Sequence, residues 1–172
     1  MKKQNNQPKQ IILLNGPSSS GKSTLSLALQ KQLVYSLDKK YCIVSIDDFM
    51  KITTSETIYE DDVFEISGDM CKAALAALKK HDGVIIDHVI TSERIFNQLK
   101  EMLDPHPILL VHVTCPLSVL KEREETRGNR CAGSAEASYE YLFPKFGYNV
   151  TIDTHFTSSK MGALNIIYQG LV

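Results

Sequence analysis

Residues 16–23 read Gly-Pro-Ser-Ser-Ser-Gly-Lys-Ser, which fits the spacing G-x-x-x-x-G-K-[ST]. In this pattern the glycines let the backbone curl so that successive N–H groups point at phosphate oxygens, and the following helix adds its dipole. Lys22 would supply a catalytic cation to the β and γ phosphates, and Ser23 would offer a hydroxyl to magnesium. We therefore expect an ATP site formed by Gly16, Pro17, Ser18, Ser19, Ser20, Gly21, Lys22, Ser23 and Thr24. The alternatives are a chance match in a Gly/Ser turn and a loop that binds nucleotide without turnover.

Acidic residues follow two apolar runs that suit buried strands. Asp87 comes directly after Val84-Ile85-Ile86, where a carboxylate can join the magnesium ligands, although an aspartate that caps a helix or opens a turn has the same pattern. Asp47 and Asp48 follow the run 42–46, and one of them could take the proton of an acceptor hydroxyl. If the strand continued through both residues, their side chains would point to opposite faces of the sheet. Only one of them could then face the acceptor and serve as the base. An exposed turn is the alternative for this pair.

Arginines are concentrated in one place. Only four of the 19 basic residues are arginines, and three of them, Arg123, Arg127 and Arg130, fall within eight positions. At spacings i, i+4 and i+7 they would share a helical face, and guanidinium groups suit the oxygens of a transferring phosphoryl group. We interpret this stretch as a lid. A solvated helix in which the arginines pair with Glu122, Glu124 and Glu125 is the alternative.

The elements that must position these residues alternate along the chain. Apolar runs predict strands at 11–14, 42–46, 84–86, 108–113 and 150–152, and apolar stripes of helical period predict helices at 25–33, 70–78, 95–103, 117–127 and 161–171. This alternation predicts a single α/β domain over residues 1–172, with helices on both faces of a parallel sheet and ligands at the carboxyl ends of its strands. Two stretches remain irregular, a candidate substrate loop at about 50–66 and the lid at about 123–147.

The composition limits the partners. The chain has 172 residues, a formal net charge of -1 and 43% hydrophobic residues, which is typical of a soluble globular protein. Without a basic excess, nucleic acid is an unlikely partner. The first apolar run is too short for a signal peptide or a membrane span, and the four cysteines lack metal-site spacing. We therefore expect a cytoplasmic protein whose oligomeric state the sequence leaves open.

Three stretches together resemble the chloramphenicol phosphotransferases and their relatives among the P-loop kinases. They are residues 11–23, residues 115–133 with Arg-Glu-Glu-Thr-Arg-Gly-Asn-Arg at their centre, and residues 148–154. The resemblance implies a sheet of the adenylate-kinase type, order 2-3-1-4-5, and transfer of the γ-phosphoryl group of ATP to a small-molecule hydroxyl. It also implies that Asp47 is the catalytic base and that Arg127 and Arg130 contact ATP. The stretch between Asp47 and Asp87 is shorter than in the family, so chloramphenicol itself is not identified as the acceptor.

Two other functions fit parts of the pattern. An acid pair after the second strand also resembles kinases of nucleic-acid ends or of nucleotide sugars, although the first would favour a basic protein. A non-catalytic ATP-sensing module would use the phosphate loop but would gain nothing from Asp47. A GTPase is disfavoured because the chain has no N-K-x-D or T-K-x-D element.

Overall fold

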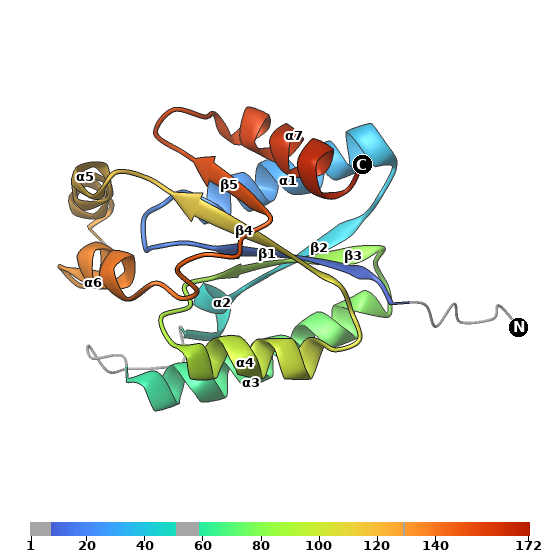
Figure 1. Cartoon of the computed structure of the whole chain (residues 1–172), viewed down its shortest axis with the longest axis horizontal. Helices are drawn as coiled ribbons and strands as arrows, with labels where there is room; N and C mark the ends of the chain where they lie inside the picture. Colours follow the sequence, from blue (N-terminus) through green and yellow to red (C-terminus); the bar gives the residue numbers. More distant parts are fainter. Residues whose placement is uncertain (1–7, 51–58, 129) are drawn as a thin grey trace, which may run out of the picture.

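One parallel sheet organises the computed structural model, which describes residues 8–50, 59–128 and 130–172. Its strand order is β2-β3-β1-β4-β5 (Figure 1), which confirms the α/β class and the order that the family resemblance implied. The strands are β1 (Gln10–Asn15), β2 (Tyr41–Ser45), β3 (Gly83–His88), β4 (Ile108–Thr114) and β5 (Val150–Asp153). Because all strands run the same way, their carboxyl ends, where Asn15, Ser45 and His88 lie, gather at one edge.

Helices cover both faces of the sheet, which confirms the three-layer arrangement. Helices α1 (Lys22–Leu37) and α7 (Ser159–Gly170) pack together on one face, and α3 (Glu60–Leu78) and α4 (Glu93–Leu103) on the other (Figure 1). Successive side chains of a strand point to opposite faces. Strand β1 therefore contributes to two cores, which contain, among others, Ile12 and Leu14 against α1, and Ile11 and Leu13 against α3 and α4.

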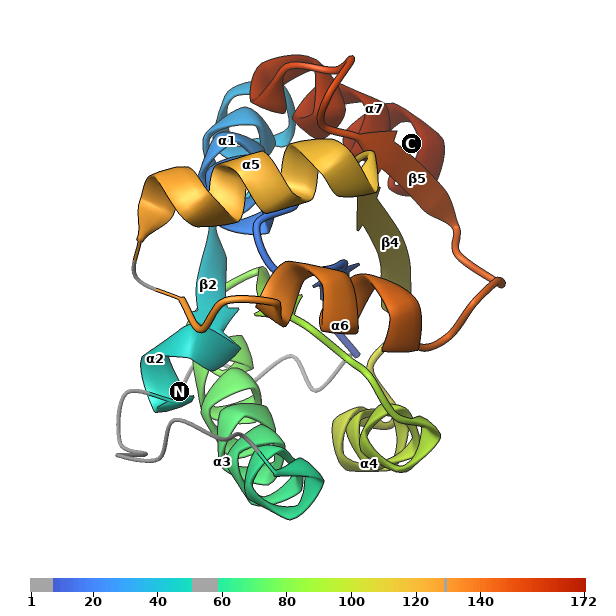
Figure 2. The same cartoon turned by 90° about the vertical axis from the view of Figure 1, so that its left-hand side faces the viewer.

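The remaining helices lie beyond the carboxyl ends of the strands. Figure 2 shows α5 (Leu117–Arg127) and α6 (Ser134–Tyr141) crossing this end of the sheet, and the short α2 (Ile46–Met50) following β2. These elements form the walls of the candidate site, so the fold gathers most of the predicted functional residues around one edge.

Three expectations from the sequence were wrong in detail. Strand β2 ends at Ser45, and Asp47 and Asp48 lie in α2, so the argument that a strand points them to opposite faces does not hold. Residues 60–66 are not loop but the first turns of α3, where three acidic residues complement the helix dipole. The predicted lid contains the helix α6. The described part of the chain thus has seven helices where five were predicted, and residues 51–58 of the expected substrate loop lie outside it.

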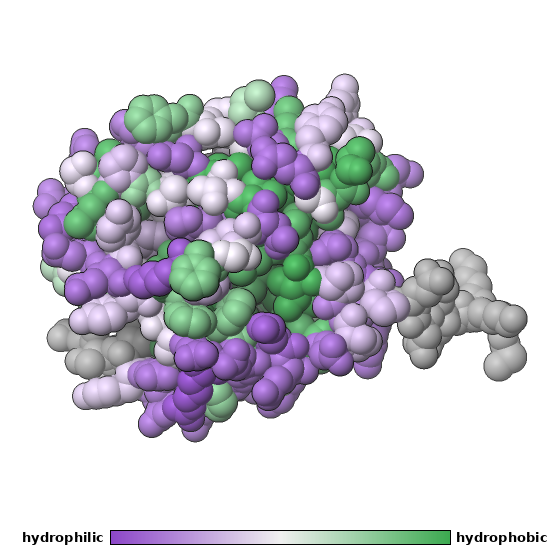
Figure 3. All heavy atoms as spheres, in the orientation of Figure 1, coloured by the Kyte–Doolittle hydropathy of each residue, from purple (hydrophilic) through white to green (hydrophobic). Residues whose placement is uncertain are grey.

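The surface is mixed. Polar side chains cover much of the face shown in Figure 3. Apolar side chains gather over its middle, the part of the view that β4 and β5 cross in Figure 1. Among the described residues, no helix combines the length and the apolar character that crossing a membrane would need.

Candidate active site

The phosphate loop has the backbone geometry that the motif requires. It connects β1 to α1, and it passes so close to β4 that a Cβ on Gly16 would lie 2.0 Å from the carbonyl oxygen of Val113. Gly21 caps α1 with a φ of 93°, a left-handed conformation that glycine adopts without strain. Both positions therefore need glycine. The loop runs directly into the N-terminus of α1, which is the positive end of the helix dipole.

Lys22 is buried and points back at the loop. Its Nζ donates hydrogen bonds to the carbonyl oxygens of Gly16, at 3.0 Å, and Pro17, at 2.9 Å. Burial lowers the pKa of Lys22, while the nearby carboxylate of Asp87 acts in the opposite direction. A buried ammonium group has lost hydration, so a nearby anion would stabilise its charged form.

Asp87 and Ser23 form an oxygen pair at the end of β3. The Ser23 hydroxyl donates to the Oδ2 atom of Asp87 at 2.8 Å. Burial raises the pKa of Asp87, and this shift is opposed by Lys22 and by the Ser23 hydrogen bond. A hydroxyl and a carboxylate are hard oxygen ligands of the kind that magnesium takes alongside phosphate oxygens and water. The pair thus has the donor set that the predicted metal site needs.

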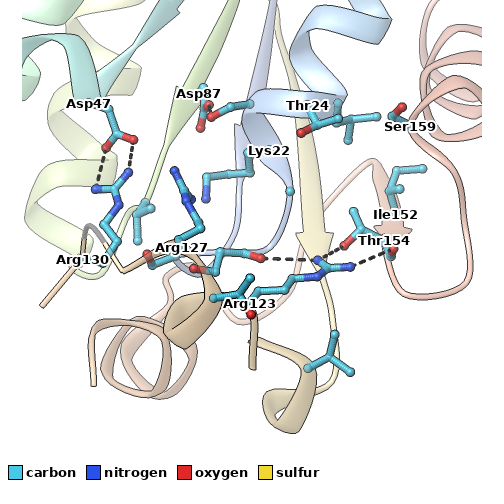
Figure 4. Close-up of a pocket in the computed structure, with 18 of the residues that line it drawn as sticks. Lys22, Thr24, Asp47, Asp87, Arg123, Arg127, Arg130, Ile152, Thr154 and Ser159 are labelled. Atoms are coloured by element: carbon cyan, nitrogen blue, oxygen red, sulfur yellow. Dashed lines mark hydrogen bonds and ion pairs between the residues drawn. The ribbon is translucent and has the colours of Figure 1, made fainter. Parts of the chain in front are cut away.

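Asp47 contacts one of the predicted lid arginines. The Arg130 guanidinium binds both carboxylate oxygens of Asp47, with Nη1 3.2 Å from Oδ1 and Nη2 also paired with Oδ2 (Figure 4). This ion pair places Asp47 opposite Arg130. Asp48, its neighbour in α2, is exposed and borders only the hollow described below as the second.

The other two arginines differ from each other. Arg123 donates from Nη1 to the Thr154 hydroxyl at 3.0 Å and from Nη2 to the Thr154 carbonyl oxygen at 3.2 Å, so it braces the end of β5. Arg127 points into the space between Arg130 and Lys22 (Figure 4). Helix α5 ends at Arg127 because Gly128 turns the chain with a left-handed φ of 61°, so Arg130 does not share a helical face with the other two.

Two hollows meet at these residues. The first, of about 780 Å³, lies over the phosphate loop and extends toward Arg123 and Thr154. The second, of about 1080 Å³, lies between α2, the start of α3, the segment after β3, and α6. Both hollows are bordered by the same residues at their junction, namely Ser18, Ser23, Ile46, Asp47, Asp87, Val89, Arg127 and Arg130.

Two polar residues at the site were missed by the sequence analysis. Ser138 of α6 accepts a hydrogen bond from the Ser18 N–H of the phosphate loop at 2.9 Å. Glu124 is 8% exposed and binds N–H groups of α6, so it does not pair with the arginines as the solvated-helix alternative supposed. The helical period of α5 indicated that Glu124 is buried, because that position is one turn from the buried Leu120. No pattern marked Ser138.

The matches to solved structures are distant in sequence and cover nearly the whole chain. The Mycobacterium tuberculosis APS kinase, in complex with AMPPNP and APS, has a TM-score of 0.76 and 16% identity over 95% of this chain and 98% of that chain. A gluconokinase from Sinorhizobium meliloti has a TM-score of 0.65 and 17% identity over 95% and 98%. The Deinococcus radiodurans tunicamycin resistance protein has a TM-score of 0.64 and 21% identity over 95% and 97%. These likenesses identify the fold as that of P-loop kinases.

Sequence comparison places the chain within one family. No curated protein matches it in sequence. The family model described as chloramphenicol phosphotransferase-like protein matches residues 9–169, which include the phosphate loop, Asp47, Asp87 and the arginine-rich stretch. The chain therefore belongs to the chloramphenicol phosphotransferase-like family.

Proposed function

We propose that this protein is an ATP-dependent kinase that transfers the γ-phosphoryl group to a hydroxyl of a small molecule. The observation that carries the proposal is the junction of the two hollows at Asp47, Asp87, Arg127 and Arg130. A phosphotransferase needs a donor space and an acceptor space that open onto the same reacting group, and this arrangement supplies both.

The first hollow is the donor space. The phosphate loop, Lys22 and the helix dipole of α1 suit the triphosphate, and the hollow continues past Arg123 to the start of α7, where the base would lie. Ser23 and Asp87 would hold magnesium, which when bound neutralises charge on the β and γ phosphates. Arg127 stabilises the charge that develops as the phosphoryl group moves.

The second hollow is the acceptor space. Its wall combines apolar side chains, such as Ile43, Val63 and Ile95, with hydroxyl groups, such as Thr91 and Ser92. This mixture suits a small organic molecule that carries hydroxyl groups. The acceptor oxygen forms a bond to the γ-phosphorus while the bond from that phosphorus to the β–γ bridging oxygen breaks, and Asp47 takes the hydroxyl proton. The products are a phosphate monoester and ADP.

The test is a screen for an added phosphate. The protein is incubated with ATP, magnesium and panels of alcohols, sugars, nucleosides and hydroxylated antibiotics, and products are identified by mass spectrometry. We expect one panel member or more to gain a phosphate in wild type and none in Lys22→Ala. Tight ATP binding with no transfer to any class would favour the ATP-sensing alternative, and phosphorylation of oligonucleotide ends would favour a nucleic-acid kinase.

A further inference from the structure

Arg130 belongs to the short connection between α5 and α6; its described residues, Gly128 and 130–133, are called the arc below. The Arg130 and Asp47 side chains are 29% and 35% exposed, so solvent screens their ion pair. A partly exposed pair of this kind adds only modestly to stability. Backbone contacts at the ends of the arc add to what holds Arg130 beside Asp47.

Glu124 fastens both ends of that backbone. Its main-chain oxygen accepts the Gly128 N–H at 3.2 Å, at the point where α5 ends. Its carboxylate accepts the Gly133 N–H at 3.0 Å through Oε2 and the Ala135 N–H at 2.7 Å through Oε1. The start of the arc is therefore set by Gly128 and an ordinary backbone bond, whereas its far end depends on the Glu124 carboxylate.

The carboxylate replaces a missing helix cap. Gly133 is the N-cap of α6 and has no side chain to accept the free N–H groups of the first turn, whereas Ser92 and Ser158 cap α4 and α7 with their own hydroxyls. Glu124 supplies the acceptor from another helix, and its charge lies at the positive end of the α6 dipole. Removing this carboxylate would take the acceptor away from the buried Ala135 N–H, whereas the N–H of the exposed Gly133 could bond to water instead.

Helix α6 is itself tied to the rest of the site. Its Ser138 hydroxyl accepts the Ser18 N–H of the phosphate loop, and just after its end the Phe143 N–H donates to the Ile90 oxygen at 2.9 Å. The link through Glu124 therefore attaches the arc to an anchored helix. Through this chain of contacts Arg130 is held at the junction of the two hollows.

We propose that Glu124 is a positioning residue that holds Arg130 over Asp47 and the transferring phosphoryl group. The inference rests on the proposed function and on the contact with ATP that the family resemblance implies for Arg130. Glu124→Ala should lower the single-turnover rate about tenfold or more while the KM for ATP changes little, because Arg130 acts mainly in the transition state. Glu124→Gln keeps one acceptor oxygen for one of the two N–H groups, so it should retain an intermediate rate.

A double-mutant cycle distinguishes positioning from general destabilisation. If Glu124 acts through Arg130, the Glu124→Ala change should cost almost nothing further in an Arg130→Ala background. Glu125→Ala, which alters an exposed neighbour on the same helix, should match wild type. Equal losses from Glu124→Ala in both backgrounds would overturn the inference.

Hydrogen exchange supplies a readout that does not depend on turnover or on an identified acceptor. Peptides that cover residues 128–138 of the unliganded protein should exchange faster in Glu124→Ala than in wild type or Glu125→Ala, while peptides from β1 and β3 stay unchanged. Unchanged exchange in 128–138 would overturn the inference whatever the rates are. An Arg130→Ala variant with the wild-type rate would instead count against the proposed function, and the exchange result would still decide the role of Glu124.

Discussion

Replacing Asp47 by asparagine should separate catalysis from stability. The amide keeps the size of the side chain and most of its hydrogen bonding, but it cannot accept the acceptor proton. Loss of a general base typically costs about a hundredfold or more in rate, or roughly 2.7 kcal/mol of transition-state stabilisation. The same change also weakens the ion pair with Arg130, whose partly exposed side chains limit the loss of folding free energy to about 1 kcal/mol. For a chain of this size that corresponds to a shift in Tm of about 2–4 °C.

The assay is single-turnover transfer to the acceptor found by the screen, with ATP affinity measured by calorimetry and Tm by circular dichroism. We expect Asp47→Asn to lose at least about a hundredfold in rate while it still binds ATP. Asp48→Asn is the matched control, because it makes the same chemical change one residue away in α2. If Asp48→Asn loses its transfer rate and Asp47→Asn keeps it, the base is Asp48 and not Asp47. Normal rates in both variants would refute the assignment of the base to α2.

Three further predictions use other residues. Lys22→Ala should abolish transfer with a native circular dichroism spectrum, and undiminished turnover would contradict its role at the phosphates. Arg127→Ala should lower the maximal rate more than the affinity for ATP, and calorimetry that shows the reverse would contradict it. Burial lowers the pKa of His88 from 6.5 to about 4, so this histidine is neutral in the folded chain above pH 4, and burial also lowers the pKa of His112. Because the unfolded chain takes up protons near pH 6.5, the free energy of unfolding should fall as the pH drops from there toward 4, by up to about 3 kcal/mol for His88. Urea denaturation should show this slope reduced in His88→Gln and kept in His155→Asn, a change at an exposed histidine; a wild-type free energy that does not vary over this range would contradict it.

The sequence predicted the elements that have a strong periodic signal. Strands β1 and β3 were found because strands buried on both faces read as continuous apolar runs. The phosphate loop was found because its glycines are dictated by backbone geometry. The roles of Asp47, Asp87 and the arginines stay predictions that the geometry supports.

The elements that were missed lack such a signal. Helix α6 buries only Ala135 and Ser138, so its sequence shows no apolar stripe. Helix α2 is five residues long, too short for any period to appear. The contacts of Glu124 and of Ser138 join segments that are 9 to 120 residues apart, and their partners are backbone N–H groups, which every non-proline residue carries. No pattern of residue types can therefore reveal them.

The shared border of the two hollows has a consequence for inhibitor design. Because eight described residues border both hollows, the two spaces adjoin, and under the proposed function a nucleotide in one would lie next to a hydroxyl compound in the other. A single molecule in which a short phosphate chain joins adenosine to the acceptor could occupy both spaces at once. Its second half would bind at the high effective concentration that a short linker provides, so its affinity would exceed that of either half. Such a bisubstrate compound would also be a practical tool for crystallising the site with both spaces filled.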